Sequence, residues 1–291
     1  MRIAVTGKQG QVVSSLLERA PQAGVEIIAV GRPELDLVNY SSIRAAILAI
    51  KPEVIVSAAA YTSVDAAEKE VELAFAINAD GPAAIAQVAA ELDIPVVHLS
   101  TDYVYPGDKM EMYIEADTTG PMSVYGKSKL AGERGVTAAN GNHAILRTAW
   151  VYSPFGANFV KTMLRLAETR DTLNVVGDQY GMPTSAFDIA DAVITISKRL
   201  IADADPELRG VFHMTGSGEA SWAELAEAIF TRLQEKSGKT VLVERIATAA
   251  YPTPARRPVN SRLSNAKLKD VYGIVLPDWR VSLRMVLDRL L

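Results

Sequence analysis

The first 150 residues of the chain repeat short, continuously apolar segments that are separated by stretches with helical spacing. A strand that is apolar at every position is covered on both faces, and strands that alternate with helices pair in parallel through right-handed crossovers. The repetition therefore predicts a doubly wound, parallel α/β sheet. We expect its strands at residues 3–6, 26–30, 54–57, 95–100 and 143–147.

The segments between these strands carry apolar residues at helical spacing. Ser41 or Ser42 is expected to cap the second helix, whose Ile43, Ile47 and Ile50 share one face. Further helices are expected at 71–92 and 124–137. The first helix is expected to bury the face that carries Val12, Val13, Leu16, Leu17 and Ala20.

After residue 150 the pattern becomes less regular, and short strands and loops rich in Pro and Gly separate the helical stretches. Residues 203–210 and 251–262 are predicted to be surface loops. Residues 151–291 are therefore expected to form mainly a smaller α/β lobe over the carboxyl ends of the strands, with some segments returning to the domain of residues 1–150. Its helices are expected at 158–169, 185–200, 221–234 and 281–291.

The amino-acid composition limits which partners and which catalytic groups the chain can have. The 291 residues include 30 Lys and Arg against 34 Asp and Glu, so no attraction to nucleic acid is expected. No apolar run reaches the about 18 residues that span a membrane, and no signal peptide is recognisable, so we expect a cytoplasmic protein. Cysteine is absent and the three histidines lack metal-ligand spacing, so no metal site is expected. Any catalysis would use hydroxyls, carboxylates, lysine or a bound cofactor.

A glycine-rich turn, Gly7 to Gly10, follows the first strand and opens the first helix. Gly7 permits a tight turn, and Gly10 lets a pyrophosphate approach the backbone N–H groups of the helix start, including those of Gln11 and Val12. This position favours a dinucleotide site of the Rossmann type over an ordinary βα turn. Val13 stands where such sites usually have a third glycine, which raises a question about how closely the helix packs.

The second strand ends in Gly31-Arg32, without the acidic residue that often binds the ribose of NAD. A guanidinium suits a 2′-phosphate, so we expect NADPH, with NADH as the alternative. Glu34 lies close enough to complicate this preference, and Arg32 could be solvated.

Tyr125 and Lys129 are four residues apart in a predicted helix, so they lie on one face. An ammonium about 4 Å from a phenol, at an effective dielectric of about 20, favours the phenolate by ~4 kcal/mol. Lys129 is therefore expected to lower the pKa of Tyr125 and to make proton transfer practical near neutral pH. Lys129 could equally pair with Glu133 on the next turn.

Thr101 and Asp102 follow a core strand and lie at the same sheet edge as the glycine turn. A hydroxyl there can hydrogen-bond a substrate carbonyl, although a strand-end turn with an Asx cap is the alternative. Together with the turn and the Tyr–Lys pair, these residues predict an oxidoreductase.

Seven segments carry a resemblance to a known family, at 7–12, 57–65, 100–105, 124–133, 147–152, 178–184 and 251–258. With them the chain resembles the extended short-chain dehydrogenase/reductases and, within that superfamily, the dTDP-4-dehydrorhamnose reductase family. The last three segments are the more specific ones. The resemblance implies reduction of the C4 keto group of dTDP-4-dehydro-β-L-rhamnose to dTDP-β-L-rhamnose by a nicotinamide cofactor, in the biosynthesis of cell-surface polysaccharide.

The resemblance also implies residue roles. Tyr125 would donate the proton, Lys129 would hold the nicotinamide ribose, and Thr101 would orient the keto oxygen. Asp102 and Trp150 would contact the sugar. The family can carry an acidic residue at the position of Gly31, and its absence weakens the case for NADH. The diphosphate of the cofactor would contact Gly10, Gln11 and Val12, and its adenine would contact Asp36 and Leu37. The central part of the dinucleotide would contact Ala59, Ala60 and Thr62.

The second lobe is expected to recognise the nucleotide of the substrate. Asn158, Gln179 and the pair Arg256-Arg257 could bind its diphosphate or base, and Trp150 offers a flat face for a sugar. Loop arginines are often solvated and a tryptophan after a strand is often core, so these assignments remain open.

The sequence leaves two alternative functions open. A nucleotide-sugar 4,6-dehydratase or 4-epimerase shares the superfamily, but dehydratases place Asp-Glu after the strand-end Thr and this chain has Asp102-Tyr103. A non-catalytic subunit similar to the regulatory subunit of methionine adenosyltransferase would bind the dinucleotide while serving a partner enzyme. A homodimer is possible, and the sequence decides neither the final sugar nor the need for a divalent ion.

Overall fold

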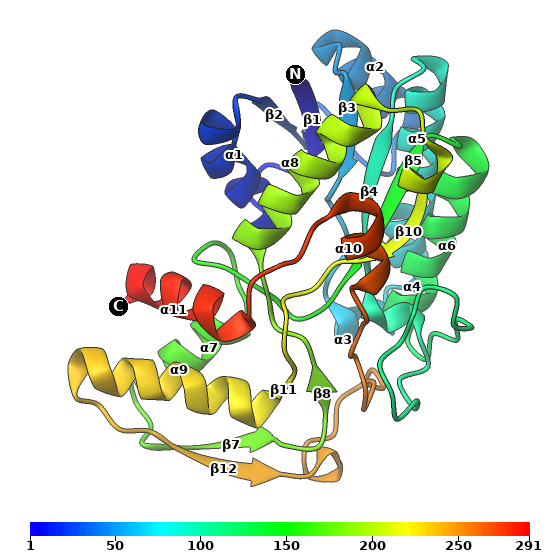
Figure 1. Cartoon of the computed structure of the whole chain (residues 1–291). Helices are drawn as coiled ribbons and strands as arrows, with labels where there is room; N and C mark the ends of the chain where they lie inside the picture. Colours follow the sequence, from blue (N-terminus) through cyan, green and yellow to red (C-terminus); the bar gives the residue numbers. More distant parts are fainter.

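The computed structural model describes residues 1–291 and contains a parallel sheet of six strands, in the order β10-β5-β4-β3-β1-β2 (Figure 1). Every pair of neighbours in it is parallel, which confirms the doubly wound α/β fold. The strands are β1 (Arg2–Thr6), β2 (Glu26–Val30), β3 (Val54–Ser57), β4 (Val96–Thr101), β5 (His143–Thr148) and β10 (Gly210–His213).

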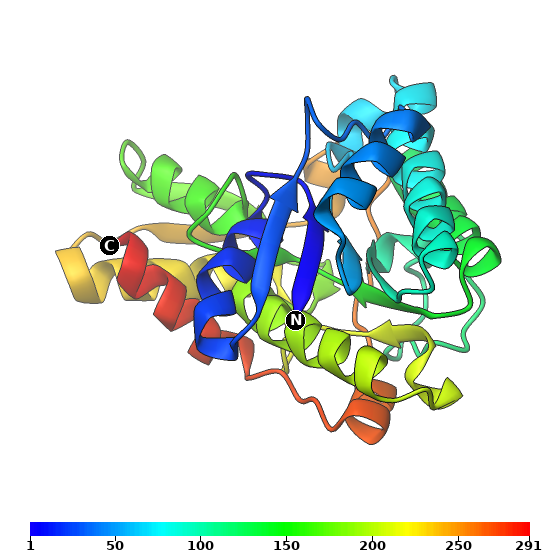
Figure 2. The same ribbon diagram turned by 90° about the horizontal axis from the view of Figure 1, so that it is seen from above.

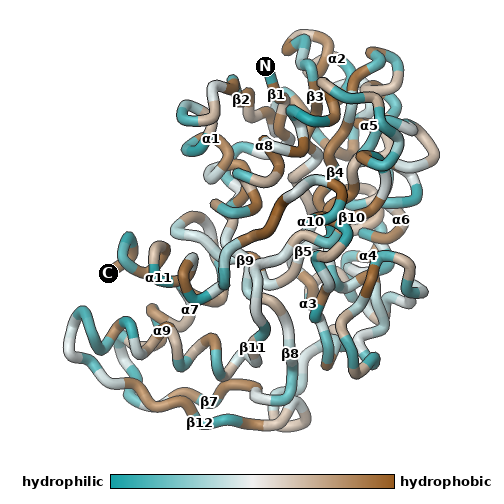
Figure 3. Tube along the Cα trace, in the orientation of Figure 1, coloured by the Kyte–Doolittle hydropathy of each residue, from teal (hydrophilic) through white to brown (hydrophobic).

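Helices cover both faces of the sheet, as Figure 2 shows from above. Ile3 and Val5 of β1 are buried against α1 and α8, and Ala4 between them is buried against α2 and α5 on the other side. This alternation explains why consecutive residues of the strands are apolar and not every second one, and the hydropathy colouring of Figure 3 shows mostly hydrophobic strands at the centre of the molecule. The helices around the sheet are α1 (Gln11–Ala23), α2 (Tyr40–Ile50), α3 (Val64–Ala67), α4 (Val71–Phe75), α5 (Gly81–Glu91), α6 (Val124–Ala139), α8 (Ala186–Ala202) and α10 (Ala266–Tyr272).

A smaller lobe with its own core lies beyond the carboxyl ends of the strands (Figure 1). Its helices are α7 (Phe159–Ala167), α9 (Trp222–Ser237) and α11 (Trp279–Leu290). Three strand pairs complete it: β7 (Thr172–Val176) with β12 (Leu242–Ile246), β8 (Tyr180–Gly181) with β11 (Ala220–Ser221), and β6 (Val151–Tyr152) with β9 (Thr184–Ser185). Because β10 and α8 join the sheet and its core, residues after 150 build both regions.

Two local predictions are wrong. The N-cap of α2 is Asn39, whose side chain accepts a hydrogen bond from the Ser42 N–H, so the helix begins before Ser41 and Ser42. Residues 251–262 are not only a surface loop, because Ala255, Asn260 and Ser261 are buried under the rim of the sheet domain. The short helices α3 and α10 were not expected from the apolar pattern, since neither has a long apolar face.

The stretch Val71–Glu91 is, against expectation, long and apolar enough to cross a membrane by length and composition. It is made of α4, a π-helical turn at Ala76–Asp80 and α5, and half of it is buried inside the protein. Ile85 and Val88 of α5 lie in the core of the sheet, and α5 packs on α6. Its apolar character is therefore that of a core helix.

Candidate functional site

The glycine-rich turn has the backbone that the sequence predicts. Gly7 has a φ of +103°, a conformation that side chains rarely adopt, and Gly10 is the extended N-cap of α1. A Cβ on Gly7 would lie 3.4 Å from Val13 Cγ2, an ordinary contact distance, so the backbone conformation and not the space beside Val13 requires a glycine here. Val13 is 2% exposed and packs in the sheet core. The valine in place of a third glycine thus leaves helix packing intact.

A cavity of about 480 Å³ opens beside this turn. It runs from the end of β1 past the end of β2 to the loop after β3. Of the predicted cofactor residues, it is lined by Gly7, Gly31, Arg32, Asp36, Leu37, Ala59 and Ala60. Gly10, Gln11, Val12, Thr62, Tyr125 and Lys129 do not line this cavity. With Gly7 and Gly31 in its lining, the cavity fits the adenosine half of a dinucleotide.

The loop after β3 is held from two sides by residues that the sequence analysis missed. Thr6 Oγ1 accepts hydrogen bonds from the N–H groups of Ala58 and Ala59, both at 3.0 Å. Buried Asn78, in the π-helical turn, binds both the N–H and the carbonyl of Tyr61. Their positions, a polar residue at a strand end and an amide within an apolar helical run, are the signal that could have found them.

Cationic groups surround the end of β2. Arg32 is exposed, and Lys8 Nζ donates to Glu34 Oε2 at 2.5 Å and to the Arg32 carbonyl at 3.2 Å. The Lys8 hydrogen bond lowers the pKa of Glu34. The carboxylate that complicated the cofactor preference is therefore paired, and Arg32 remains available to a phosphate.

Gln11 and Asn158 meet where the two regions join. The Gln11 side-chain oxygen accepts from Ser153 and Asn158, each at 2.9 Å. Asn158 also caps α7 through the Lys161 N–H. Both side-chain amides already form these hydrogen bonds. Gln11 can therefore contact a diphosphate only through its backbone. The predicted diphosphate contact of Asn158 is not supported.

Four polar residues gather at the carboxyl end of β4, and we call Thr101, Asp102, Tyr125 and Lys129 the reactive cluster. Thr101 ends β4 and Asp102 opens the following 3₁₀ turn, while Tyr125 and Lys129 come from the first two turns of α6. The two elements touch at Gly126, where a Cβ would lie 2.2 Å from the Tyr103 carbonyl oxygen. A glycine at this position is what brings Tyr125 beside Thr101.

The expected effect of Lys129 on Tyr125 is wrong for the ligand-free protein. Burial raises the pKa of Tyr125 well above its usual range, and the side-chain hydrogen bond with Thr101 offsets only part of this. Lys129 instead donates to the Leu99 carbonyl at 2.7 Å, with His98 Nε2 at 3.3 Å, because β4 passes directly beneath it. The alternative pairing with Glu133 is also wrong, since Glu133 binds Arg147.

Asp102 is a buried carboxylate without a cationic partner. Thr101 Oγ1 donates to it at 2.9 Å and Ser261 Oγ at 2.5 Å. Burial raises the pKa of Asp102 to about 6, although both hydroxyls lower it. Ser261 comes from the segment that was predicted as a surface loop, so only the folded chain reveals it as part of the cluster.

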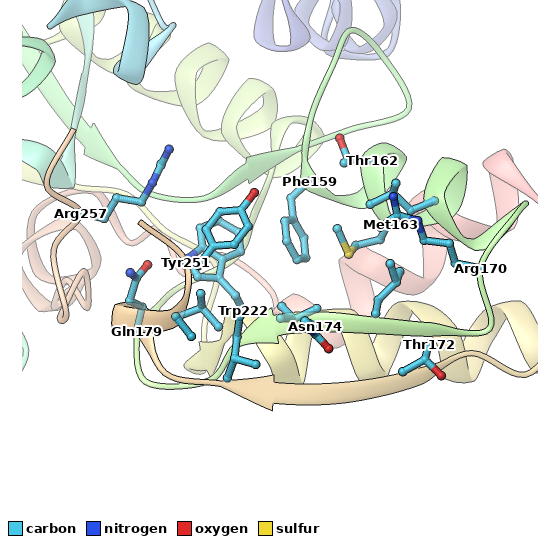
Figure 4. A pocket seen from close by; sticks show the side chains of 16 residues that line it. Phe159, Thr162, Met163, Arg170, Thr172, Asn174, Gln179, Trp222, Tyr251 and Arg257 are labelled. Atoms are coloured by element: carbon cyan, nitrogen blue, oxygen red, sulfur yellow. The ribbon is translucent and has the colours of Figure 1, made fainter. Parts of the chain in front are cut away.

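A second cavity, of about 640 Å³, lies in the smaller lobe (Figure 4). Phe159, Met163 and Trp222 form apolar walls, and Gln179, Tyr251 and Arg257 lie at one end. The predicted Gln179 and Arg257 thus share one pocket. Arg256 is exposed and lies outside it.

Trp150 is less open than expected. Its ring stacks on Trp222, with ring centres 3.5 Å apart and planes 9° apart, and Gly181 packs against it as well. The face that Trp222 covers is not free to stack on a sugar. Trp222 itself was missed, because a tryptophan at a helix start has no sequence signature of binding.

Arg257 connects this second cavity to Tyr125. Its Nη2 forms an ion pair with Asp65 at 2.7 Å, and its Nη1 donates to the Tyr103 hydroxyl at 3.3 Å. The Tyr103 ring meets that of Tyr125 edge to face, with centres 5.5 Å apart. No group of three or more His, Asp or Glu side chains could hold a metal ion.

The parallel sheet, the glycine turn over a long cavity and the Thr101–Tyr125–Lys129 arrangement at the sheet edge define a protein of the short-chain dehydrogenase/reductase class. A family model described as the RmlD substrate binding domain matches residues 1–291. A dTDP-4-dehydrorhamnose reductase of Sinorhizobium fredii is 54% identical over 291 residues, with 100% of this chain and 98% of that protein covered. The chain belongs to the dTDP-4-dehydrorhamnose reductase family.

Solved structures of enzymes with the same name are also similar to this chain. A dTDP-4-dehydrorhamnose reductase from Clostridium acetobutylicum is 38% identical with a TM-score of 0.93, covering 100% of this chain and 99% of that one. The enzyme of the same name from Bacillus anthracis, in complex with NADP, is 34% identical with a TM-score of 0.91, covering 99% of both chains.

Proposed function

We propose that the chain reduces the C4 keto group of dTDP-4-dehydro-β-L-rhamnose to give dTDP-β-L-rhamnose, with NADPH as the preferred cofactor and NADH as the alternative. The observation that carries the proposal is the reactive cluster at the sheet edge, in a chain of this family. The Bacillus anthracis relative binds NADP. Exposed Arg32 beside a carboxylate that Lys8 neutralises supports the same preference here.

The cofactor supplies the hydride, and the chain binds and orients it. We assign the dinucleotide to the turn and to the 480 Å³ cavity. Lys129 has three ammonium protons and uses two on β4, which leaves one for the nicotinamide ribose. The proposed cofactor residues are Gly7, Gly10, Gln11, Val12, Gly31, Arg32, Asp36, Leu37, Ala59, Ala60, Thr62, Tyr125 and Lys129.

Tyr125 holds the proton that reduction of a ketone consumes. Because burial raises its pKa, the phenol is protonated in the ligand-free protein at neutral pH. Addition of a hydride to C4 develops negative charge on the keto oxygen, and Tyr125 gives that oxygen its proton. Thr101 would orient the keto oxygen when its hydroxyl proton turns from Asp102 to the bound substrate, and its hydrogen bond with Tyr125 tunes the phenol. Alignment and a preset proton donor are thus what the protein contributes.

The nucleotide of the substrate is assigned to the 640 Å³ cavity of the smaller lobe. Arg257 is the cation at its end and suits a diphosphate, which would compete with Asp65 for the guanidinium. Asp102 and the uncovered part of Trp150 would contact the sugar. We further propose that the protein acts in the cytoplasm on this small-molecule substrate, with neither nucleic acid nor membrane as partner, and possible homodimer formation remains a prediction.

The test is turnover of the keto sugar nucleotide with NADPH and with NADH, with the C4 configuration of the product determined by NMR. We expect the rhamnose product and a higher kcat/KM with NADPH. A strong preference for NADH would contradict the cofactor assignment. Stoichiometric NAD on the purified protein would favour an epimerase, and absent turnover with tight binding to another enzyme would favour a regulatory subunit.

A further inference from the structure

His98 is a buried histidine that the proposed mechanism has not used. It lies in the middle of β4 and is 0% exposed. Its Nε2 is 3.3 Å from Lys129 Nζ, and its Nδ1 is 3.1 Å from Ser57 Oγ on the neighbouring strand β3. Ser57 and His98 are direct partners in the sheet register, so the backbone fixes this contact.

Only one proton arrangement lets His98 accept a hydrogen bond from an ammonium group. Nε2 must then carry no proton, so Nδ1 carries it and donates to Ser57 Oγ. Burial keeps the ring neutral by lowering the pKa of His98 well below its usual value, and the charge of Lys129 lowers it further. The Lys129 ammonium group, which can only donate, thus selects this tautomer, and the Ser57 hydroxyl accepts the Nδ1 proton.

We propose that His98 is a positioning residue for Lys129: with the Leu99 carbonyl it binds two of the three ammonium protons and aims the third at the cofactor. This rests on the proposed function, in which Lys129 holds the nicotinamide ribose. The two acceptors are consecutive residues of β4, so a single rigid strand fixes the direction of the ammonium group.

The acceptors also matter for the charge of Lys129. Burial lowers the pKa of Lys129 to about 8, and the carboxylate of Glu133 acts in the opposite direction. Glu133 is itself held by Arg147, and the other titratable groups near this point are Tyr125 and, beside His98, His143. Removal of the His98 acceptor would lower the pKa of Lys129 further, because the charged form loses a hydrogen bond.

The first experiment compares His98→Leu, which removes both ring nitrogens, with His98→Gln, whose amide oxygen can replace Nε2 as acceptor. We expect the basic limb of the kcat/KM profile to lie near pH 8 in the parent and to move down by about one pH unit in His98→Leu. Calorimetry with NADPH should show about tenfold weaker binding at pH 8 for the same variant. His98→Gln should restore most of both.

A matched control is His143→Gln, which changes another buried histidine of the same sheet that does not touch Lys129. Its pH profile should stay that of the parent. Equal shifts in all three variants, or parental behaviour of His98→Leu, would overturn the proposal. If His98→Leu does not fold, Ser57→Ala provides the second variant. We expect its basic limb to shift in the same direction by a smaller amount, and an unchanged pH profile would contradict the proposal.

A measurement without turnover keeps this inference separate from the proposed function. In the full chain labelled with ¹⁵N-histidine, NMR should show His98 neutral with its proton on Nδ1 at pH 7. A proton on Nε2 would contradict the proposal, since that nitrogen could not accept from the ammonium group. If the tautomer is as expected and the keto sugar is not reduced, the proposed function fails while the placement of Lys129 stands.

Discussion

Two buried polar clusters lie side by side at the ends of β4 and β5 and are built from neighbouring residues of the same elements. The reactive cluster uses Thr101 and Lys129. The second, which we call the structural cluster, uses the residue before Thr101 and the residue one turn after Lys129. Its members are Ser100, Tyr105, Glu133, Arg147 and His213.

The clusters differ in how their charges are matched. Glu133 receives both Nε and Nη2 of Arg147, at 2.9 and 2.6 Å, and the Ser100 hydroxyl. Asp102 and Lys129 are equally buried, but they bind only neutral groups. Burial therefore shifts both of their pKa values toward neutrality. A paired buried charge holds the fold together, whereas an unpaired one stays ready to exchange a proton.

We expect the strongest change in catalysis. Tyr125→Phe should lower kcat about 1,000-fold with little change in KM, because it removes the proposed proton donor and leaves the packing of the ring intact. Steady-state kinetics with NADPH measures this. Tyr103→Phe is the control, since it removes a neighbouring phenol hydroxyl that we assign no proton transfer. Near-parental kcat in Tyr125→Phe would remove Tyr125 from its role.

The structural cluster should respond in stability instead. Glu133→Gln should lower the free energy of unfolding by about 3–5 kcal/mol, because it leaves the Arg147 guanidinium buried without a counter-charge. Urea unfolding at pH 7 measures the loss. Replacing both partners by apolar residues, as in Glu133→Leu with Arg147→Met, should recover much of it. If the single variant is as stable as the parent, the pair does not have the structural role that separates the clusters.

Asp102→Asn should do the opposite and stabilise the protein at pH 7. The folded-state pKa of Asp102 is about 6 against an ordinary 3.8, so the folded state binds the proton more tightly than the unfolded chain. The protonated form of Asp102 contributes its whole stabilisation below about pH 4, and this stabilisation is lost as the pH rises through 6. The ionised carboxylate thus costs up to about 3 kcal/mol at neutral pH.

Thermal unfolding between pH 4 and 8 checks this sign. The parent should lose stability with rising pH across that window by more than the Asn variant, while the variant should show reduced turnover. A variant that is less stable than the parent at pH 7 would show that the hydroxyl donors of Thr101 and Ser261 outweigh the burial of the charge.

The smallest effect is expected at the cation between the second cavity and the reactive cluster. Arg257→Ala should raise KM for the sugar nucleotide about tenfold and leave KM for NADPH unchanged, because the guanidinium lines the proposed nucleotide cavity. Arg256→Ala is the matched control, being the exposed neighbour. Equal behaviour of the two variants would show that the cavity does not use Arg257.

Local signals in the amino-acid sequence were enough to predict the sheet and the edge at which we place the ligands. Continuous apolar segments, a helix after each and glycines at the first turn are local signals, so β2, β3 and the Gly7 turn could be read directly. The Tyr125–Lys129 spacing likewise places both side chains on one helix face whatever surrounds them.

The pKa values of the buried groups and the contacts between distant residues depend on the folded chain. Lys129 turns to His98 and Leu99 because β4 lies beneath α6, and Ser261 reaches Asp102 from 159 residues away. Whether a buried charge is paired depends on such distant contacts, and pairing sets its pKa. Spacing along a helix specifies direction, but the neighbours that a side chain meets in that direction come from the folded chain.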